Sequence, residues 1–509
     1  MHRKWWTLIA VCVATFMLLL DITIVNVALP DIERQLHASF SELQWVVDAY
    51  ALMLAALLLT AGSLADLFGR RIVFATGLAL FTLASLACGL APTAVTLDLA
   101  RGFQGIGGAV MFATSLALLA QEFEGRERGT AFGIWGATIG GAVAIGPLVG
   151  GALTEGLGWE WIFFVNIPIG IGAVALTLLR VPESRDADAR GVDWAGVLTW
   201  SSALFLMVFA LIRGNDEGWG SALIVGLLTG SVALLVAFFV VELRQERPML
   251  DLSLFRKPTF AGASIVAFAL SSAMFSMFLY LTLYIQNVLG FSPLQAGLRF
   301  LPITLVSFFF APLAGRLSAR FPARVFLTLG LCLVATGLLL MGGLHYSSGW
   351  TALLAGFLVA GAGVGTVNPV LASTAIGVVP PARSGMASGI NNTFRQVGIA
   401  TGVAALGAVF QARVETKLTD ALSSTPAAGA VSRLSHAVSS GQTQQVVQSV
   451  PRPLRGTVAH ASRQAFIGGL NELFVIAGVV AFAGAFLALV LVRQRDFVGA
   501  PQAAPAPAG

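Results

Sequence analysis

The amino-acid sequence predicts an all-helical protein embedded in a membrane. Hydrophobic residues make up 57% of the chain and charged residues only 11%, and the mean hydropathy is +0.84. A soluble protein carries about 25% charged residues, so this chain has too little polar surface to face water. The apolar residues also gather in runs of about 20, the length that crosses a bilayer as a helix.

Fourteen apolar runs are predicted to be transmembrane helices. The first follows the basic start MHRKWW and is about 22 residues long, which exceeds the apolar core of a signal peptide. We therefore expect it to remain in the mature protein. The predicted spans are 7–29, 44–65, 72–91, 94–119, 129–153, 161–180, 193–212, 221–242, 259–285, 294–315, 325–343, 350–373, 386–410 and 469–492.

An internal repeat indicates that the chain has two related halves. The stretch GSLADLFGRR at 62–71 is similar to GRLSARFPAR at 315–324, and GIGG at 105–108 is similar to GAGV at 361–364. Both pairs are separated by roughly 255 residues, as two copies of one unit would be. Spans one to six therefore correspond to spans nine to fourteen.

The repeat predicts how the chain is organised. We expect a six-helix bundle over 1–192, two inserted spans over 193–247, and a second six-helix bundle over 248–496. A long outer loop is expected over 411–468, as a short amphipathic helix or without fixed structure. Residues 497–509 form a tail rich in Pro and Ala that is predicted to be disordered.

Arginine and lysine set the predicted orientation. If the N-terminus is cytoplasmic, only Arg34 and Arg213 lie in short outer connections, and the other basic residues of short connections lie inside. Both termini are then cytoplasmic, and we expect a multi-pass protein of a bacterial inner membrane.

Several function classes are disfavoured by what the sequence lacks. No HExxH motif and no histidine cluster is present, and none of the three lysines follows a glycine, so there is no GxxxxGK[ST] phosphate loop. The three cysteines lie in apolar segments, which argues against a disulfide framework or a metal site. The arginines form no single basic patch for nucleic acid. We therefore expect no enzyme, no metal and no cofactor, and a proton gradient as the energy source.

The short connection after span two carries a charged motif. In GSLADLFGRR, Gly62 and Gly69 allow close approach and a tight turn. Asp66 is expected to accept hydrogen bonds from a helix N-terminus or to pair with an arginine across the two halves. Arg70 and Arg71 fit the excess of positive charge inside. The motif predicts a latch that holds one conformation.

Two ionisable residues lie inside predicted spans. Asp21 is roughly 13 Å and Arg101 roughly 10 Å from the outer ends of spans one and four, at 1.5 Å per residue. Charged groups in spans usually face a partner or a cavity. We expect Asp21 to face a polar cavity in which Arg101 or water stabilises it, while a snorkelling Arg101 is the alternative.

Span five has a face of small residues. Gly146, Gly150 and Gly151 permit close helix packing, and Pro147 opens one backbone hydrogen bond. This pattern alone indicates only helix packing. Its spacing also resembles the antiporter motif of exporters in the major facilitator superfamily.

Together these stretches resemble one subfamily in particular. LDITIVNVALPDIERQL (20–36), QWVVDAYAL (44–52), WEWIFFVNIPIG (159–170), PMLDLSLFRKPTF (248–260) and GMASGINNTFRQVG (385–398) are similar to the fourteen-spanner drug:proton antiporters of the EmrB and QacA type. The resemblance covers nearly all of the chain except the long outer loop and the tail. It implies the major facilitator fold, with two six-helix bundles and two inserted helices.

The resemblance also implies a function and a set of site residues. It implies a proton-coupled exporter in which Asp21 titrates during transport, with Asp48 as a second candidate that could equally be a solvated rim residue. Arg395 and Gln396 are expected either to face the cavity or to pack the two halves. Weaker cavity candidates are Asn26, Gln104, Asn391 and Asn392.

The expected partners are an amphipathic or cationic small molecule, protons and membrane lipid, with a periplasmic adaptor as a further candidate. A dedicated exporter of one endogenous product would have the same sequence features, and a transport-inactive sensor is a third hypothesis.

Overall fold

The computed structural model is all-helical over the residues that it describes, which are 3–38, 40–185, 191–245, 248–423, 425, 429, 431–439, 447 and 450–498. The first half contains α1 (Arg3–Leu36), α2 (Phe40–Phe68), α3 (Arg70–Gly89), α4 (Ala94–Glu122), α5 (Gly125–Gly156), α6 (Trp161–Phe164) and α7 (Asn166–Arg180). The inserted pair is α8 (Trp194–Glu217) and α9 (Ala222–Arg244).

The second half begins with η1 (Leu252–Arg256) and ends with η7 (Gln494–Asp496). Between them lie α10 (Pro258–Leu270), η2 (Ser271–Phe275), α11 (Ser276–Leu283), η3 (Tyr284–Val288), α12 (Pro293–Leu317), α13 (Ala323–Met341), η4 (Trp350–Leu353), α14 (Leu354–Gly377), η5 (Pro381–Arg383), α15 (Ser384–Leu422), α16 (Val431–Ser439) and α18 (Arg452–Leu491).

The number of spans agrees with the prediction from composition. Thirteen helices of the described part are long and apolar enough to cross a membrane. The one predicted span that is not among these thirteen, span five at 129–153, falls within the long helix α5. Span nine is one helical rod of four segments, because the π-helical turns η2 and η3 interrupt α10 and α11. Apolar length alone did not predict these two π-helical turns.

The long outer connection is shorter than predicted. The expected loop covered 411–468, but α15 continues to Leu422 and α18 already begins at Arg452. Both helices therefore extend beyond the apolar stretches that marked the spans. The expected short amphipathic helix corresponds to α16. The predicted tail also begins later, since Val498 still donates a backbone hydrogen bond of 3.0 Å to Gly377, and residues 499–509 lie outside the described part.

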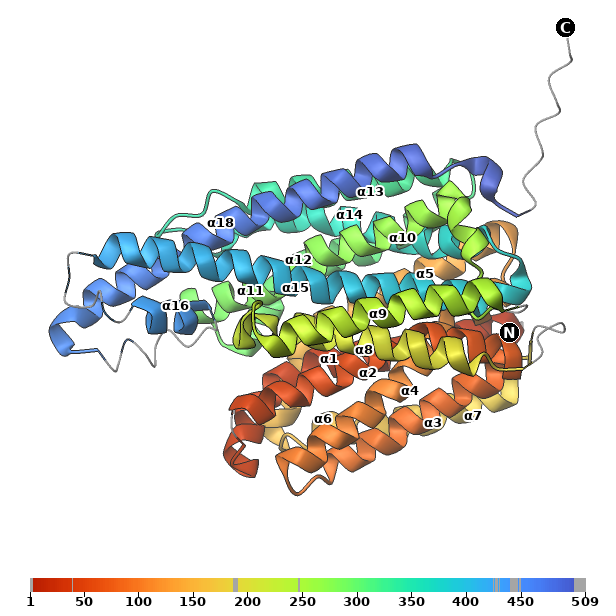
Figure 1. Cartoon of the computed structure of the whole chain (residues 1–509), viewed down its shortest axis with the longest axis horizontal. Helices are drawn as coiled ribbons and strands as arrows, with labels where there is room; N and C mark the ends of the chain where they lie inside the picture. Colours follow the sequence, from red (N-terminus) through yellow and green to blue (C-terminus); the bar gives the residue numbers. More distant parts are fainter. Residues whose placement is uncertain are drawn as a thin grey trace, which may run out of the picture.

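The two halves meet most closely at the end of the molecule that holds the start of α1 and the end of α18, which we call the terminal face (Figure 1). There a Cβ on Gly133 of α5 would lie 2.8 Å from Pro312 Cα of α12. Towards the opposite end, a Cβ on Gly151 would lie 3.9 Å from the Leu294 side chain, an ordinary contact. Helices α5 and α12 therefore diverge away from the terminal face.

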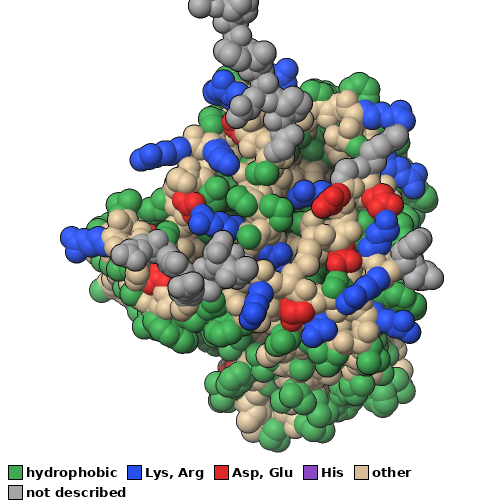
Figure 2. Space-filling model, turned by 90° about the vertical axis from the view of Figure 1, so that its right-hand side faces the viewer, with side chains coloured by type: hydrophobic (Ala, Val, Ile, Leu, Met, Phe, Trp, Pro, Cys, Tyr) green, Lys and Arg blue, Asp and Glu red, His purple; other side chains and the backbone are tan. Residues whose placement is uncertain are grey.

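The terminal face is rich in basic side chains. Figure 2 shows Lys and Arg spread over it, together with several carboxylates. Exposed arginines expected on one side of the membrane include Arg3, Arg180, Arg185, Arg244, Arg256, Arg316, Arg320, Arg324, Arg383, Arg493 and Arg495. These arginines belong to the connections that the sequence places on the cytoplasmic side.

Candidate functional site

A buried ion pair joins α1 and α4 inside the first half. Arg101 Nη1 donates to Asp21 Oδ2 at 2.5 Å, and the two side chains are 1% and 0% exposed. The structure therefore places the two charged residues at one level, and Arg101 does not snorkel. Asp21 is fully buried among residues of its own half and pairs with Arg101, one of the two stabilising groups expected for it. Arg101 and two amide groups surround the carboxylate.

Two amides complete the hydrogen bonds of Asp21. Gln104 Nε2 donates to Asp21 Oδ1 at 2.8 Å, and Asn166 Nδ2 donates to the same oxygen at 3.3 Å. Arg101 Nη1 also donates to Gln104 Oε1 at 2.7 Å. Asn166 in turn donates to Ser85 Oγ at 3.1 Å. A buried charge is tolerable only when it is paired and hydrogen-bonded, and this network meets that condition. We call these five residues the Asp21 network.

Sequence reasoning missed Asn166 and Ser85. Asn166 had a local signal, because it is the single amide in the apolar stretch WEWIFFVNIPIG. Ser85 had none, since serine is common in membrane helices. Both are fully buried.

The guanidinium of Arg101 also contacts helix α2. Its Nε donates to the backbone oxygen of Val46 at 2.9 Å, and its Cζ lies 4.3 Å from the ring centroid of Tyr50. Ser85 belongs to α3, and Val46 and Tyr50 belong to α2, so the Asp21 network and its contacts connect α1, α2, α3, α4 and α7. A change of charge at Asp21 therefore affects five helices of one half.

Two further candidates are not part of this network. Asp48 is partly buried, and the described residues provide it with no hydrogen bond or ion pair. Asn26 is exposed and donates only to the backbone oxygen of Ile22, at 3.2 Å. The structure thus brings Gln104 to Asp21 but leaves Asp48 and Asn26 outside.

The charged motif at the terminal face joins the two halves. Asp66, at the end of α2, accepts from the backbone N–H groups of Gly385 and Met386 at 3.0 and 2.8 Å. These donors belong to the first turn of α15, so Asp66 caps a helix of the other half. Its arginine partner is Arg70 of its own half, at 2.8 Å, and not an arginine across the halves.

Arg70 makes the second connection between the halves. Its Nη2 donates to the backbone oxygens of Pro381 and Ala382 at 2.8 and 2.7 Å. A carboxylate and a guanidinium from one half thus bond only main-chain groups of the other. We call Asp66 and Arg70, with the groups that they bind at 381–386, the terminal latch.

The remaining motif residues have different tasks. A Cβ on Gly62 would lie 2.9 Å from the carbonyl carbon of Gly385, so close contact between α2 and α15 requires glycine. Gly69 has φ +110°, which favours glycine. Glu183 accepts from the backbone N–H of Arg71 at 3.0 Å and caps α3. Sequence reasoning missed Glu183, which follows span six and has no local signal.

The small-residue face of α5 packs on α1 beside the ion pair. A Cβ on Gly146 would overlap the side chain of Thr23, and one on Gly150 would lie 2.9 Å from Ile24 Cγ1. Thr23 and Ile24 directly follow the turn that carries Asp21. Gly151 faces α12 instead, and the side chain of Pro147 lies outside the described residues.

Helix α15 carries a row of buried polar groups. Asn392 Nδ2 donates across the halves to the backbone oxygen of Phe112 at 3.4 Å. Ser388 Oγ and Asn391 Nδ2 have no partner among the described residues. Arg395 is 7% exposed, and the described residues give it an aromatic contact with Phe275 at 5.8 Å but no carboxylate. Gln396, next to it, is only partly buried.

The chain is a polytopic helical protein whose two halves pack through glycines and a charged latch, which is how a membrane transporter of the rocking type is built. Residues 11–403 match the Major Facilitator Superfamily, and the chain belongs to that superfamily.

Similar proteins include resistance and export proteins of actinobacteria. Multidrug resistance protein Stp of Mycobacterium tuberculosis (strain CDC 1551 / Oshkosh) is 40% identical over 81% of this chain and 77% of that protein. The tetracenomycin C resistance and export protein of Streptomyces glaucescens is 32% identical over 99% of this chain and 95% of that protein. Among solved structures, the human organic anion transporter MFSD10 (TETRAN) has a TM-score of 0.65 at 14% identity, covering 96% and 100% of the two chains. That last likeness concerns the fold alone.

Proposed function

We propose that this protein exports drugs or other amphipathic small molecules across the bacterial inner membrane in exchange for protons. The observation that carries the coupling is the buried pair of Asp21 and Arg101. The names of the similar proteins, which include multidrug resistance and antibiotic export, support the kind of substrate.

Binding of a proton to the Asp21–Arg101 pair would change which arrangement of the helices is stable. Protonation of Asp21 removes one charge and leaves Arg101 buried without a counter-ion. An uncompensated charge in apolar surroundings is costly, so the protonated network favours a different arrangement of α1 and α4. Deprotonation restores the pair. Two conformations with different affinity for a proton are what proton coupling requires.

The change at Asp21 has a direct route to the second half. Gly146 and Gly150 of α5 lie on the turn of α1 that follows Asp21, and other residues of α5 contact α12. A shift of α1 therefore moves α5 against the second half. At this contact the glycines of α5 lie directly against Thr23 and Ile24 of α1, so the two helices can move little relative to each other without steric overlap.

We assign the terminal face to the cytoplasm because its connections carry the arginines. The terminal latch then closes the cytoplasmic side in this conformation, and substrate enters from the cytoplasm or inner leaflet when the latch opens. The buried polar groups of α15, among them Asn391 and Arg395, would contact the substrate between the halves. The work is transport rather than chemistry, with protons and lipid as further partners and a periplasmic adaptor as an additional one.

A dedicated exporter of one endogenous product is a second candidate. It is favoured by the tetracenomycin relative, whose name couples resistance with export of a single compound. A transport-inactive sensor would instead tolerate loss of the charge at Asp21.

The test is proton release from inverted membrane vesicles that respiration has acidified inside. Wild type, Asp21→Asn and Asp48→Asn are given lipophilic cationic dyes and neutral antibiotics at equal protein abundance. We expect substrate to discharge the gradient in wild type and in Asp48→Asn, which loses no hydrogen bond of the described part, but not in Asp21→Asn.

Other outcomes discriminate among the hypotheses. If no compound in a broad panel discharges the gradient, multidrug export is wrong and a single endogenous substrate moves ahead. If Asp21→Asn behaves as wild type, export survives but Asp21 is not the coupling group. If only Asp48→Asn loses coupling, the proton site is Asp48.

A further inference from the structure

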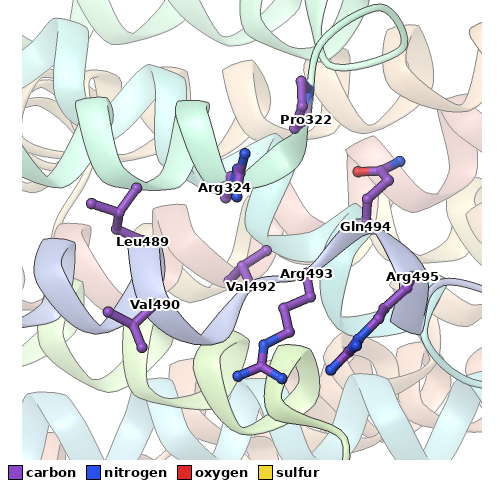
Figure 3. A pocket seen from close by; sticks show the side chains of 8 residues that line it. All are labelled: Pro322, Arg324, Leu489, Val490, Val492, Arg493, Gln494 and Arg495. Carbon is purple, nitrogen blue, oxygen red and sulfur yellow. The ribbon is translucent and has the colours of Figure 1, made fainter.

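A pocket opens on the terminal face between the beginning of α13 and the end of α18 (Figure 3). Its volume is about 520 Å³. It lies in the second half and shares no residue with the Asp21 network or the terminal latch. Pro322 and Arg324 end the repeated stretch GRLSARFPAR, but the proposed transport cycle does not use this pocket.

Three arginines line this pocket. Arg324 comes from the first turn of α13, while Arg493 and Arg495 follow the last turn of α18. All three are exposed, and the described residues provide none of them with a carboxylate partner. Three like charges around one concavity attract an anion.

The nearest carboxylate along the chain, Asp496, forms hydrogen bonds with Thr259. Asp496 Oδ2 accepts from Thr259 Oγ1 at 2.7 Å and from the backbone N–H of Thr259 at 3.1 Å. Thr259 also accepts from the backbone N–H of Arg493 at 2.7 Å. These bonds fix the chain after α18, so the rim of the pocket is held in place and its positive charge is left uncompensated.

The end of α13 adds to the positive potential. Its N-cap is Pro322, whose side chain accepts no hydrogen bond from the first turn. The backbone N–H of Val325 donates to the backbone oxygen of Pro322 at 3.0 Å. The N–H groups that stay unbonded at a helix start, together with the positive end of the helix dipole, favour an anion. Phosphate groups bind at such positions.

The opposite wall of the pocket is apolar. Leu489 and Val490, on the last turn of α18, are 51% and 48% exposed. Side chains of this kind at the end of a span face the hydrocarbon of the bilayer. A free phosphate ion would leave this wall unused, whereas a lipid would cover it with its acyl chains.

From this combination we propose that the pocket binds the phosphate head of an anionic phospholipid. Arg324, Arg493 and Arg495 hold the phosphate at the uncapped start of α13, and Leu489 and Val490 contact the acyl chains. Basic pockets between helices at the cytoplasmic side of a membrane suit such lipids. Because α13 and α18 belong to the second half, the lipid would tie these two helices together at the membrane surface.

Native mass spectrometry of the purified full-length protein tests this proposal. Wild type is mixed with phosphatidylglycerol or with phosphatidylcholine of the same acyl chains, with and without sodium phosphate. The pocket variant is Arg324→Gln/Arg493→Gln/Arg495→Gln. The matched control is Arg244→Gln/Arg256→Gln/Arg316→Gln, which removes three exposed arginines elsewhere. Thermal unfolding checks that each variant is folded, and the single variant Arg324→Gln replaces the triple if it is not.

We expect wild type and control to retain phosphatidylglycerol over phosphatidylcholine by at least about tenfold, and the pocket variant to lose this preference. Equal retention of both lipids by wild type would overturn the proposal, and so would equal loss in both variants. If sodium phosphate alone displaces phosphatidylglycerol at matched concentration, the pocket is an anion site and not a lipid site.

Discussion

Asp66 Oδ2 accepts a hydrogen bond of 2.8 Å from the backbone N–H of Met386, which lies 320 residues further along the chain. The bond joins the end of α2 to the first turn of α15. Together with the bond from Gly385, it makes one carboxylate both the cap of a helix and a link between the halves.

We predict that Asp66→Asn shifts the protein away from the conformation closed at the terminal face. The neutral side chain loses charge-assisted bonds to α15 and to Arg70, which costs about 2 kcal/mol, roughly thirtyfold in the closing equilibrium. Distances between spin labels at the exposed positions Phe68 and Arg320 should lengthen. Asp496→Asn, which affects bonds within the second half only, should leave them unchanged. Unchanged distances in Asp66→Asn would mean that the latch does not hold the halves together.

Replacing Gly62 tests the contact between α2 and α15 by steric overlap instead of by loss of charge. In Gly62→Ala the new methyl would overlap the backbone of Gly385, so we expect substrate export to fall at least about tenfold. Gly141→Ala is the matched control, because a Cβ there has no atom within 4 Å. The control should keep export and gain about 0.5–1 kcal/mol of stability from the better helix former. Equal loss of export in both variants would point to a general effect of glycine replacement.

The Asp21 network predicts that a second substitution can restore stability to Asp21→Asn without restoring transport. Asp21→Asn leaves Arg101 buried and unpaired, which should lower the free energy of unfolding by about 3–5 kcal/mol. Asp21→Asn/Arg101→Gln removes both charges and should recover much of this loss, yet neither variant should exchange substrate for protons. Thermal unfolding in detergent and the vesicle assay measure the two effects. Recovery of transport in the double variant would show that the charges serve only the fold.

We expect replacement of Arg395 to change the free energy of unfolding in the opposite direction to replacement of a buried arginine that has a carboxylate partner. Because no carboxylate of the described part compensates its charge, Arg395→Met is expected to raise the free energy of unfolding by at least about 1 kcal/mol. Arg70→Met, which breaks the pair with Asp66, should lower it. We expect export to fall in both variants. A less stable Arg395→Met protein would reveal that the arginine is compensated within the fold.

Composition was enough to predict transmembrane helices, because helices satisfy the backbone in so many apolar runs of bilayer length, while the two-bundle arrangement depended on the internal repeat and on the family resemblance. The same criterion misplaced the long outer connection. It detects where the lipid ends, whereas α15 continues through QARVETKLTDAL with Val414, Leu418 and Leu422 buried. A test for apolar length does not detect a polar extension of a helix.

The candidate site was predictable only in part. Asp21, Arg101 and Asp66 stood out because a charge inside or beside a span needs a reason. Their partners could not be found in this way, since Asn166 and Glu183 are defined by which helices pack together. The direction in which Asp21 points depended on the same packing. The role of Asp21 in coupling stays a prediction until the vesicle experiment is done.

The terminal latch also constrains how this protein evolves under selection by drugs. The donors to Asp66 from the other half are main-chain amides, and every amino acid except proline carries one. The hydrogen bond at position 386 therefore does not depend on the side chain there, whereas the buried side chain of Met386 is constrained by its packing and by the backbone N–H of Asp251. Within the terminal latch, adaptive changes that alter gating should therefore fall at Asp66, Arg70, Gly62 and Gly385.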